Sequence, residues 1–200
     1  MSRKQLAIKL SKLINLDKLD VSLEQYQTDS NLAAEFLWLA YTNGDIQDKV
    51  IADFGCGNGI LGIGALILGA KFVYFLDISE NALEKCKENI KLFKFKNYKL
   101  INSDVVDFSF DVNAVVMNPP FGVQRRKADK MFLETAMKFS NKIYSIHKIE
   151  SQKFIEKLAE EKGFKILDIV KAKFFIKRSY NFHTKEKYDI DVGYWVLSKS

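Results

Sequence analysis

Apolar residues follow a helical spacing over the first part of the chain. They recur every three or four positions between Leu6 and Ile14, which predicts an amphipathic helix over residues 2–16. The polar residues at 28–30 can cap a second apolar helix. That helix should end at Asn43-Gly44, because such a pair is typical of helix C-termini.

The pattern changes after residue 45, where short apolar runs alternate with helical segments. The runs that predict strands are 50–52, 72–76, 98–101, 114–117 and 143–146. The segments with helical spacing are 60–68, 80–95, 129–140 and 150–162. Two longer alternating segments, 164–176 and 188–198, suit an antiparallel hairpin. We therefore expect an α/β fold: a seven-stranded, mostly parallel sheet with helices on both faces and an antiparallel C-terminal strand.

The length and composition predict one globular domain. The 200 residues suit a single well-packed unit, with a helical extension over 1–44 and an α/β core over 45–200. Apolar residues at 48% and charged residues at 28% argue against disorder. No apolar stretch approaches the ~20 residues that span a bilayer, and lysines interrupt the N-terminal apolar positions, unlike a signal peptide. The sequence therefore predicts a cytoplasmic protein without a membrane segment.

The charge and the cysteines narrow the possible partners. A net charge of +6 fits nucleic acid, although an ordinary Lys-rich surface explains it equally well. Cys56 and Cys86 form no Cys-x-x-Cys pair and no ligand set with His147 or His183, so we predict no metal site. Each histidine is interpreted as a packing, hydrogen-bonding or RNA-contacting residue rather than a catalytic base.

Four of the predicted strands end in an acidic or amide side chain. These residues are Asp53, Asp77, Asp104 and Asn118. In open α/β sheets, ligands bind beyond the carboxyl ends of the strands, so the four side chains should gather along one rim. A carboxylate at Asp104 could accept a hydrogen bond from an adenine amino group, although it could also be a solvated turn residue.

A glycine-rich turn follows the first of these strands. The stretch Asp53-Phe54-Gly55-Cys56-Gly57-Asn58-Gly59 allows positive φ angles and a close approach of the backbone to a ligand. Gly57-x-Gly59-x-x-Gly62 satisfies a dinucleotide-binding pattern, and Asp77 lies at the matching distance for a ribose. The same stretch fits the Asp-x-Gly-x-Gly-x-Gly loop of methyltransferases in another register. The loop alone leaves both interpretations open, and a tight turn without a ligand is a third.

The tetrapeptide Asn118-Pro119-Pro120-Phe121 decides between these interpretations. Two prolines fix φ and remove two backbone donors, which leaves a stiff turn with exposed carbonyl oxygens. The Asn118 amide oxygen and the Pro119 carbonyl can both accept hydrogen bonds from one planar –NH₂ group, and Phe121 can stack on it. Such a grip favours an available nitrogen lone pair and aims it at a sulfonium methyl group. The tetrapeptide therefore predicts methyl transfer to a planar amine.

Five segments together resemble the methyltransferase-like 5 family, whose members methylate adenine N6 in small-subunit ribosomal RNA. The segments are Leu23-Glu24-Gln25-Tyr26-Gln27-Thr28, Asp53-Phe54-Gly55-Cys56-Gly57-Asn58-Gly59-Ile60-Leu61, Met117-Asn118-Pro119-Pro120-Phe121-Gly122, Tyr144-Ser145-Ile146-His147-Lys148 and Lys177-Arg178-Ser179-Tyr180-Asn181-Phe182-His183. The first and fourth are the family-specific part, while Gln27 and Asn58 depart from its usual residues. The resemblance implies a Rossmann-like class I methyltransferase fold with S-adenosylmethionine as cofactor.

The resemblance and the glycine loop together give an expected cofactor-binding set. Its members are Gln25, Thr28, Asp53, Gly55, Gly57, Asn58, Gly59, Ile60, Asp77, Asp104 and Val105. By the resemblance, Asp77 would hold the ribose, and Asp104 with Val105 the adenine. The family also implies a small zinc-containing activator protein that adds a strand beside the third strand, here residues 93–101. The aromatic residues of this edge could instead pack under the neighbouring helix.

Basic residues follow the catalytic tetrapeptide and recur in the tail, where aromatic residues interleave with them over 171–187. Cations can reach phosphates around an extruded base, and aromatic side chains can stack on unpaired bases. A solvated loop with core aromatics is the alternative for the tail. The residues expected to bind RNA are Arg125, Arg126, Lys127, Lys177, Arg178 and His183.

An RNA adenine-N6 methyltransferase is therefore the leading hypothesis, with ribosomal RNA as its expected substrate. The nearest alternative is the same chemistry on another planar amine: guanine N2, DNA adenine or a protein glutamine. Alternatives of other classes are an NAD-type oxidoreductase, which would use the same glycine loop, and an RNA-binding module without catalysis.

Overall fold

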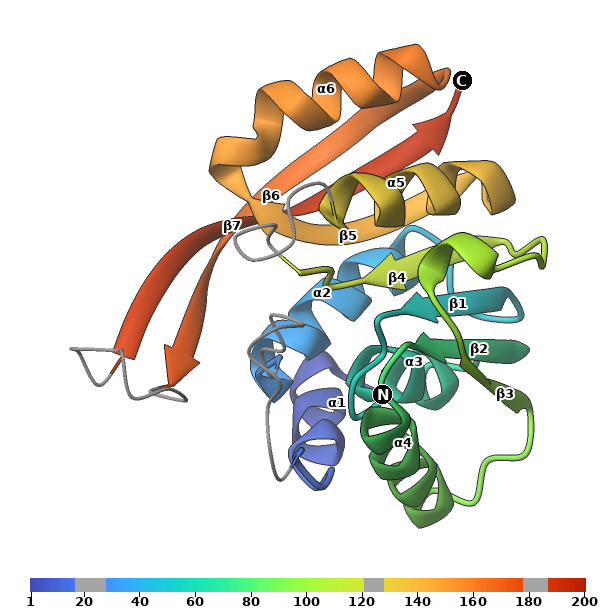
Figure 1. The fold of residues 1–200 in the computed structure, drawn as a ribbon. Coiled ribbons are helices and arrows are strands. Elements are labelled where there is room, and N and C mark those ends of the chain that lie inside the picture. The colour runs from blue at the N-terminus through green and yellow to red at the C-terminus, as the bar shows by residue number, and fades with distance from the viewer. Residues whose placement is uncertain (17–27, 121–127, 178–186) are drawn as a thin grey trace.

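The computed structural model describes residues 1–16, 28–120, 128–177 and 187–200. In this part of the chain, seven strands form one sheet in the order β3-β2-β1-β4-β5-β7-β6 (Figure 1). The strands are β1 (Val50–Phe54), β2 (Phe72–Asp77), β3 (Tyr98–Asn102), β4 (Ala114–Met117), β5 (Lys142–Lys148), β6 (Phe164–Lys177) and β7 (Lys187–Lys199). β1 to β5 pair in parallel, and β7 runs antiparallel to both β5 and β6. The predicted seven-stranded, mostly parallel sheet is confirmed.

Helices cover both faces of the sheet (Figure 1). One face carries α1 (Arg3–Leu10), α2 (Ser30–Thr42), α3 (Ile60–Ile67) and α4 (Glu80–Leu92). The other carries α5 (Ala128–Phe139) and α6 (Gln152–Glu161). Short 3-10 turns, η2 (Val105–Asp107) and η3 (Ile149–Ser151), join some of the elements. Among the described residues, no helix has the length and apolar character needed to cross a membrane.

The N-terminal helices share a buried core with the α/β part of the chain. Leu10 of α1 and Leu37 of α2 belong to the same apolar cluster as Ile63 of α3. Gly64 permits this contact, because a Cβ at that position would lie 2.2 Å from Leu37 Cδ1. The close approach fixes α2 against α3, and hence against the loop from which α3 begins.

Parallel pairing aligns the carboxyl ends of the central strands. Phe54, the last residue of β1, pairs with Leu76 of β2 and with Met117 of β4. The chain therefore leaves these strands at one edge of the sheet. The glycine loop, Asp77 and Asn118 emerge together there, as the sequence predicts.

Two of the expected rim residues lie away from the strand ends. Asp53 lies inside β1, paired with Phe75 and Val116, because Phe54 continues the strand into the apolar core. Asp104 lies beyond the end of β3 and caps the turn η2, where its side chain accepts from the Val106 N–H at 3.3 Å. Asp77 and Asn118 therefore lie at the strand ends, whereas Asp53 lies one residue inside β1 and Asp104 lies two residues beyond β3.

The first helix is shorter than the sequence predicts. α1 ends at Leu10, whereas the apolar spacing continues to residue 14. Beyond the helix, the backbone N–H and carbonyl of Ile14 bond to the side chain of Asn89 in α4, at 2.8 and 2.9 Å. These backbone groups are therefore bound by α4. Leu13 is buried in a turn, which explains why the apolar spacing persists.

Candidate functional site

A glycine loop joins β1 to α3. Gly55, Gly57 and Gly59 have φ angles of 66°, 54° and 86°, in the left-handed region that favours glycine. Gly59 is the N-cap of α3, and a Cβ there would lie 2.6 Å from Cys86 Sγ of α4. Position 59 therefore needs glycine for its conformation and for the space around it.

Two buried carboxylates hold this loop. Asp53 Oδ2 accepts from the backbone N–H of Gly62 at 2.7 Å, and Asp77 Oδ2 accepts from that of Gly57 at 2.8 Å. Asp77 Oδ1 accepts from the N–H of Ser79 at 2.9 Å. These bonds tie the loop and the first turn of α3 to the ends of β1 and β2.

Burial raises the pKa of both carboxyl groups. The pKa of Asp53 rises to about 7, because the loss of water outweighs the hydrogen bond from Gly62, and the charge of Asp77 adds to the rise. Burial also raises the pKa of Asp77, against backbone hydrogen bonds led by those from Ser79 and Gly57. A cation near Asp53 would favour its ionised form, so the site suits a positively charged ligand group.

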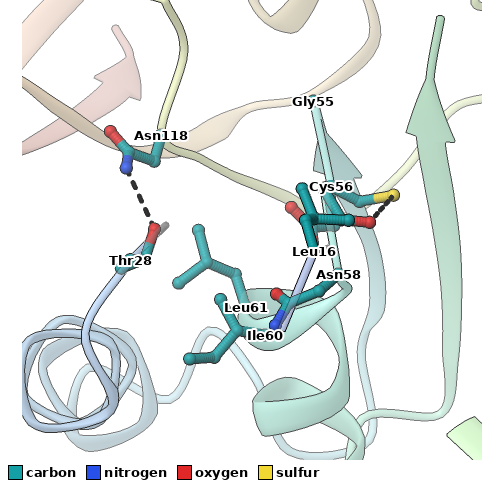
Figure 2. Close-up of a pocket in the computed structure, with 10 residues that line it drawn as sticks. Leu16, Thr28, Gly55, Cys56, Asn58, Ile60, Leu61 and Asn118 are labelled. Atoms are coloured by element: carbon teal, nitrogen blue, oxygen red, sulfur yellow. Dashed lines mark hydrogen bonds between the residues drawn. The ribbon is translucent and has the colours of Figure 1, made fainter. Parts of the chain in front are cut away.

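Asn118 follows β4 directly and faces Thr28 across the rim (Figure 2). Its Nδ2 donates to Thr28 Oγ1 at 3.0 Å. Its Oδ1 is turned away from Thr28 (Figure 2), is buried, and has no hydrogen-bond partner among the residues that the structure describes. A buried acceptor without a partner costs about 1–3 kcal/mol, so this oxygen calls for an explanation.

A pocket lies between the glycine loop, the N-terminal segment and Asn118 (Figure 2). It encloses about 390 Å³ of empty space, part of which is open to solvent. Its lining residues are Leu16, Thr28, Asp53, Gly55, Cys56, Gly57, Asn58, Ile60, Leu61 and Asn118. The lining combines a carboxylate, amides and a hydroxyl with apolar walls. It can therefore enclose a ligand that has both a charged and an apolar part.

Part of the expected cofactor set lines this pocket. The members that do so are Thr28, Asp53, Gly55, Gly57, Asn58 and Ile60. Gly59 and Asp77 lie behind the lining and hold the loop in shape. Asp104 and Val105 lie further along the rim, after β3. The structure places the glycine loop and Asn118 around one pocket, whereas Asp104 and Val105, the pair expected at the adenine, are not among its lining residues.

Some predicted residues lie outside the described part of the chain. Gln25 of the cofactor set is one of them, and Phe121 of the tetrapeptide is another. Pro119 is buried and Pro120 half-buried immediately after Asn118. The described part of the tetrapeptide therefore begins directly after the end of β4 and is at least half-buried.

Sequence reasoning missed several residues around the pocket. Leu16, Cys56 and Leu61 line it without having been proposed as ligand contacts. Asn89 also escaped notice, although it supports the wall formed by the N-terminal segment. A signal for it exists, because Asn89 lies on the buried stripe of α4 beside Cys86 and Ile90, where an apolar residue is expected.

His147 is buried within β5. Its Nε2 lies 2.7 Å from Ser145 Oγ, and burial lowers the pKa of the imidazole to about 3. The ring is therefore neutral near pH 7. The burial of His147 and its contact with Ser145 support a packing and hydrogen-bonding role for this residue. On the neighbouring strand, Trp195 pairs with Ser145, and its Nε1 is buried without a partner among the described residues.

Most residues expected to bind RNA lie outside the described ranges. These are Arg125, Arg126, Lys127, Arg178 and His183. Lys177 is the last residue of β6 and pairs with Lys187 of β7. Since β5 pairs with β7 only as far as Val192, the rest of the hairpin projects beyond the sheet (Figure 1).

β3 forms one edge of the sheet. Phe93 and Phe95 stack beside it, with ring centroids 6.0 Å apart. Together with Tyr98 and Leu100, they are partly buried against the main core. These aromatic side chains therefore contribute to the fold, and the backbone edge of β3 has no further strand beside it in the described part of the chain.

Known proteins are similar to this chain in sequence and in fold. Residues 28–168 match the model of the Methyltransferase small domain family. The rRNA N(6)-adenosine-methyltransferase METTL5 of Danio rerio is 33% identical to this chain, over 97% of each protein. The chain belongs to the methyltransferase-like 5 family. The resemblance drawn from the five segments is thereby confirmed, and the glycine loop is that of a methyltransferase rather than of an NAD-type oxidoreductase.

Solved structures agree at the level of the fold. The crystal structure of PH1948 from Pyrococcus horikoshii has a TM-score of 0.91 and 44% identity, and the match covers 100% of this chain and 97% of that one. Magnesium protoporphyrin IX methyltransferase from Synechocystis, solved with bound SAM, has a TM-score of 0.66 at 16% identity. That match covers 84% of this chain and 77% of the other. The Rossmann-like class I methyltransferase fold is therefore confirmed.

Proposed function

We propose that this protein transfers the methyl group of S-adenosylmethionine to the N6 amino group of an adenine in small-subunit ribosomal RNA. Membership in the methyltransferase-like 5 family supports the reaction and the substrate. The observation that carries the chemistry is Asn118, which lines the pocket and whose buried Oδ1 has no partner among the described residues. This oxygen can accept a hydrogen bond, and the amino group of a base is a donor of the required kind.

The orientation of Asn118 follows from Thr28. Because Nδ2 is bound to Thr28 Oγ1, the amide presents its oxygen rather than its nitrogen to an incoming –NH₂ group. The Pro119 carbonyl would accept the second hydrogen of that group. Holding both hydrogens favours an available lone pair on the nitrogen. Proximity and polarisation then lower the barrier, and the surplus proton of the methylated nitrogen leaves to water.

The pocket residues fit the proposed cofactor. When bound, S-adenosylmethionine supplies an electrophilic methyl group on a sulfonium centre. Asp53 suits a ligand with positive charge, and the glycine loop lets the backbone approach a ligand closely. We assign the remaining contacts as the sequence predicts them: Gln25, Thr28, Asn58 and Ile60 would bind the cofactor, Asp77 would hold its ribose, and Asp104 with Val105 its adenine.

The RNA would be held by basic residues from two segments of the sequence. We assign this role to Arg125, Arg126 and Lys127, which follow the tetrapeptide, and to Lys177, Arg178 and His183 of the tail. Phosphate contacts of this kind position a nucleic acid without reading its sequence. Phe121 would stack on the extruded base.

Three further assignments belong to the same proposal. The backbone edge of β3 is available to a small zinc-containing activator protein that adds a strand. The protein would act in the cytoplasm. The helices of residues 1–44 would belong to the methyltransferase domain of residues 45–200, because Leu10 and Leu37 share a core with Ile63.

Nucleoside analysis tests this function. The protein is incubated with methyl-labelled S-adenosylmethionine and unmethylated small ribosomal subunits, and the RNA is digested to nucleosides. The label should appear in N6-methyladenosine with the wild-type protein and be absent with Asn118→Ala. Label in 2-methylguanosine or in protein, without N6-methyladenosine, would contradict the proposal in favour of another planar amine.

A further inference from the structure

The side chain of Asn89 connects two walls of the pocket. Asn89 is fully buried in α4. Its Oδ1 accepts from the backbone N–H of Ile14 at 2.8 Å. Its Nδ2 donates to the carbonyl of Ile14 at 2.9 Å and to the carbonyl of Asn58 at 3.0 Å. One amide thus binds both backbone groups of a residue in the N-terminal segment and a carbonyl of the glycine loop.

A second bond joins the same two walls directly. Asn58 Nδ2 donates to the carbonyl of Ile14 at 3.2 Å. Two residues further on, Leu16 lines the pocket with Asn58 and Ile60 (Figure 2). The position of this N-terminal wall therefore depends on the bonds at Ile14.

Only a neutral amide suits the position of Asn89. The site requires one acceptor and two donors at once, and an amide side chain supplies both. A carboxylate would direct an oxygen at two carbonyls, and an apolar side chain would take this partner from the N–H of Ile14 and the carbonyl of Asn58, leaving the Ile14 carbonyl only its bond from Asn58. A helix that needed only apolar packing would gain nothing from an amide between Cys86 and Ile90.

We infer that Asn89 is a positioning residue for the cofactor. It holds residues 14–16 against the glycine loop, so that the wall of the pocket is formed before the ligand arrives. Without Asn89 the wall occupies this arrangement for a smaller fraction of the time. The apparent affinity falls in proportion to that fraction, whereas the reaction of the bound complex is unaffected. This inference rests on the proposed cofactor site.

Calorimetry with S-adenosylhomocysteine tests the inference. We expect the Kd of Asn89→Ala to rise about tenfold over wild type, as for a wall formed a tenth of the time. In methyl transfer to small subunits, KM for S-adenosylmethionine should rise in the same way, with kcat at saturation within about twofold of wild type. If Asn89 served only to stabilise the fold, Asn89→Ala would lower the melting temperature without raising KM while kcat stayed unchanged.

Asn97→Ala is the matched control. Asn97 Nδ2 also donates to two carbonyls, those of Ala70 at 3.1 Å and Lys71 at 2.9 Å, but at the amino ends of β2 and β3. Its loss should lower stability and leave the Kd for S-adenosylhomocysteine unchanged. If Asn89→Ala does not fold, Asn89→Ser takes its place, and the same rise in Kd is expected.

Hydrogen exchange on the wild-type protein gives an independent measurement. The backbone N–H of Ile14 should exchange slowly, and more slowly still with S-adenosylhomocysteine bound, because ligand and wall stabilise each other. No effect of the ligand on exchange at Ile14, or an unchanged Kd in a folded Asn89 variant, would overturn the inference. Failure of the wild-type protein to bind S-adenosylhomocysteine would instead overturn the proposed function.

Discussion

Two asparagines beside the pocket, the fully buried Asn89 and the half-buried Asn118, are bonded in opposite ways. Asn89 uses its amide oxygen and nitrogen within the protein, in three bonds to Ile14 and Asn58. Asn118 uses only its nitrogen, on Thr28, and leaves Oδ1 without a partner in the described part of the chain. A satisfied amide rigidifies its surroundings, whereas an unsatisfied one is stabilised when a ligand supplies the missing bond. We therefore propose that the Asn89 side of the pocket serves binding and the Asn118 side serves the reaction.

The largest expected effect is at Asn118. Asn118→Ala should lower kcat about 10²–10³-fold, by analogy with the loss of one preorganised hydrogen bond in other active sites. The Kd for S-adenosylhomocysteine should stay within about twofold of wild type, because the role that we propose for Asn118 is to bind the substrate amine. Single-turnover methylation of small ribosomal subunits measures the rate, and calorimetry the affinity. A variant that methylates at the wild-type rate would remove Asn118 from the mechanism.

Gly59→Ala changes the glycine loop, on the Asn89 side of the pocket, and should lower the free energy of unfolding. Left-handed strain at a φ of 86° and a Cβ 2.6 Å from Cys86 Sγ together should cost about 3 kcal/mol of unfolding free energy. Gly163→Ala is the control, since Gly163 has a φ of 72° and no atom within 4 Å of an added Cβ. It should cost only the strain, about 1 kcal/mol. Equal losses in urea unfolding would show that the contact with α4 is unimportant.

Thr28→Val tests how Asn118 is oriented. Valine keeps the shape of threonine but cannot accept from Asn118 Nδ2, so the amide loses its preferred direction. We expect kcat to fall about tenfold. Thr28→Ser, which retains the hydroxyl, should stay within about threefold of wild type. If valine reduces kcat no more than serine does, the hydroxyl of Thr28 does not orient Asn118.

The smallest expected effect is a pH dependence of S-adenosylmethionine binding that arises from the ionisation of Asp53. Its pKa of about 7 lies above the ordinary 3.8, so the stability of the ligand-free protein falls as pH rises from the ordinary value to about 7, where Asp53 ionises. A cationic ligand favours the ionised form. S-adenosylmethionine should therefore bind about fivefold more tightly at pH 8 than at pH 6. Calorimetry at both pH values on wild type and Asp53→Asn checks this, and equal pH dependence of the two would exclude Asp53 as the cause.

The local parts of the fold could be predicted from the sequence. Apolar runs separated by helical segments predict the sheet, because each strand of a parallel sheet is buried on both faces. The glycine loop and Asn118 could be found for a related reason: each directly follows a strand, and parallel strands end at one edge. The positions of Gly57 and Gly59 also reflect a local requirement, their positive φ angles.

The long-range parts of the site could not be predicted in this way. Asn89 and Ile14 are 75 positions apart, and nothing in the spacing of α1 shows that a side chain of α4 binds its continuation. Asp104 was expected at a strand end, but β3 ends at Asn102 and a 3-10 turn follows. The contact between Thr28 and Asn118 likewise depends on how α2 packs on α3. Such contacts are fixed by tertiary packing, which periodicity does not encode.

The most direct test compares Asn118→Ala and Asn89→Ala in one experiment. The Kd for S-adenosylhomocysteine and the single-turnover methylation rate at saturating S-adenosylmethionine are measured for both variants and for wild type. The two variants should fail in opposite ways: Asn118→Ala with wild-type affinity and a lost rate, and Asn89→Ala with weakened affinity and a near-normal rate. Loss of affinity and rate in the same proportion in both variants would contradict the division of the pocket into a binding side and a reacting side.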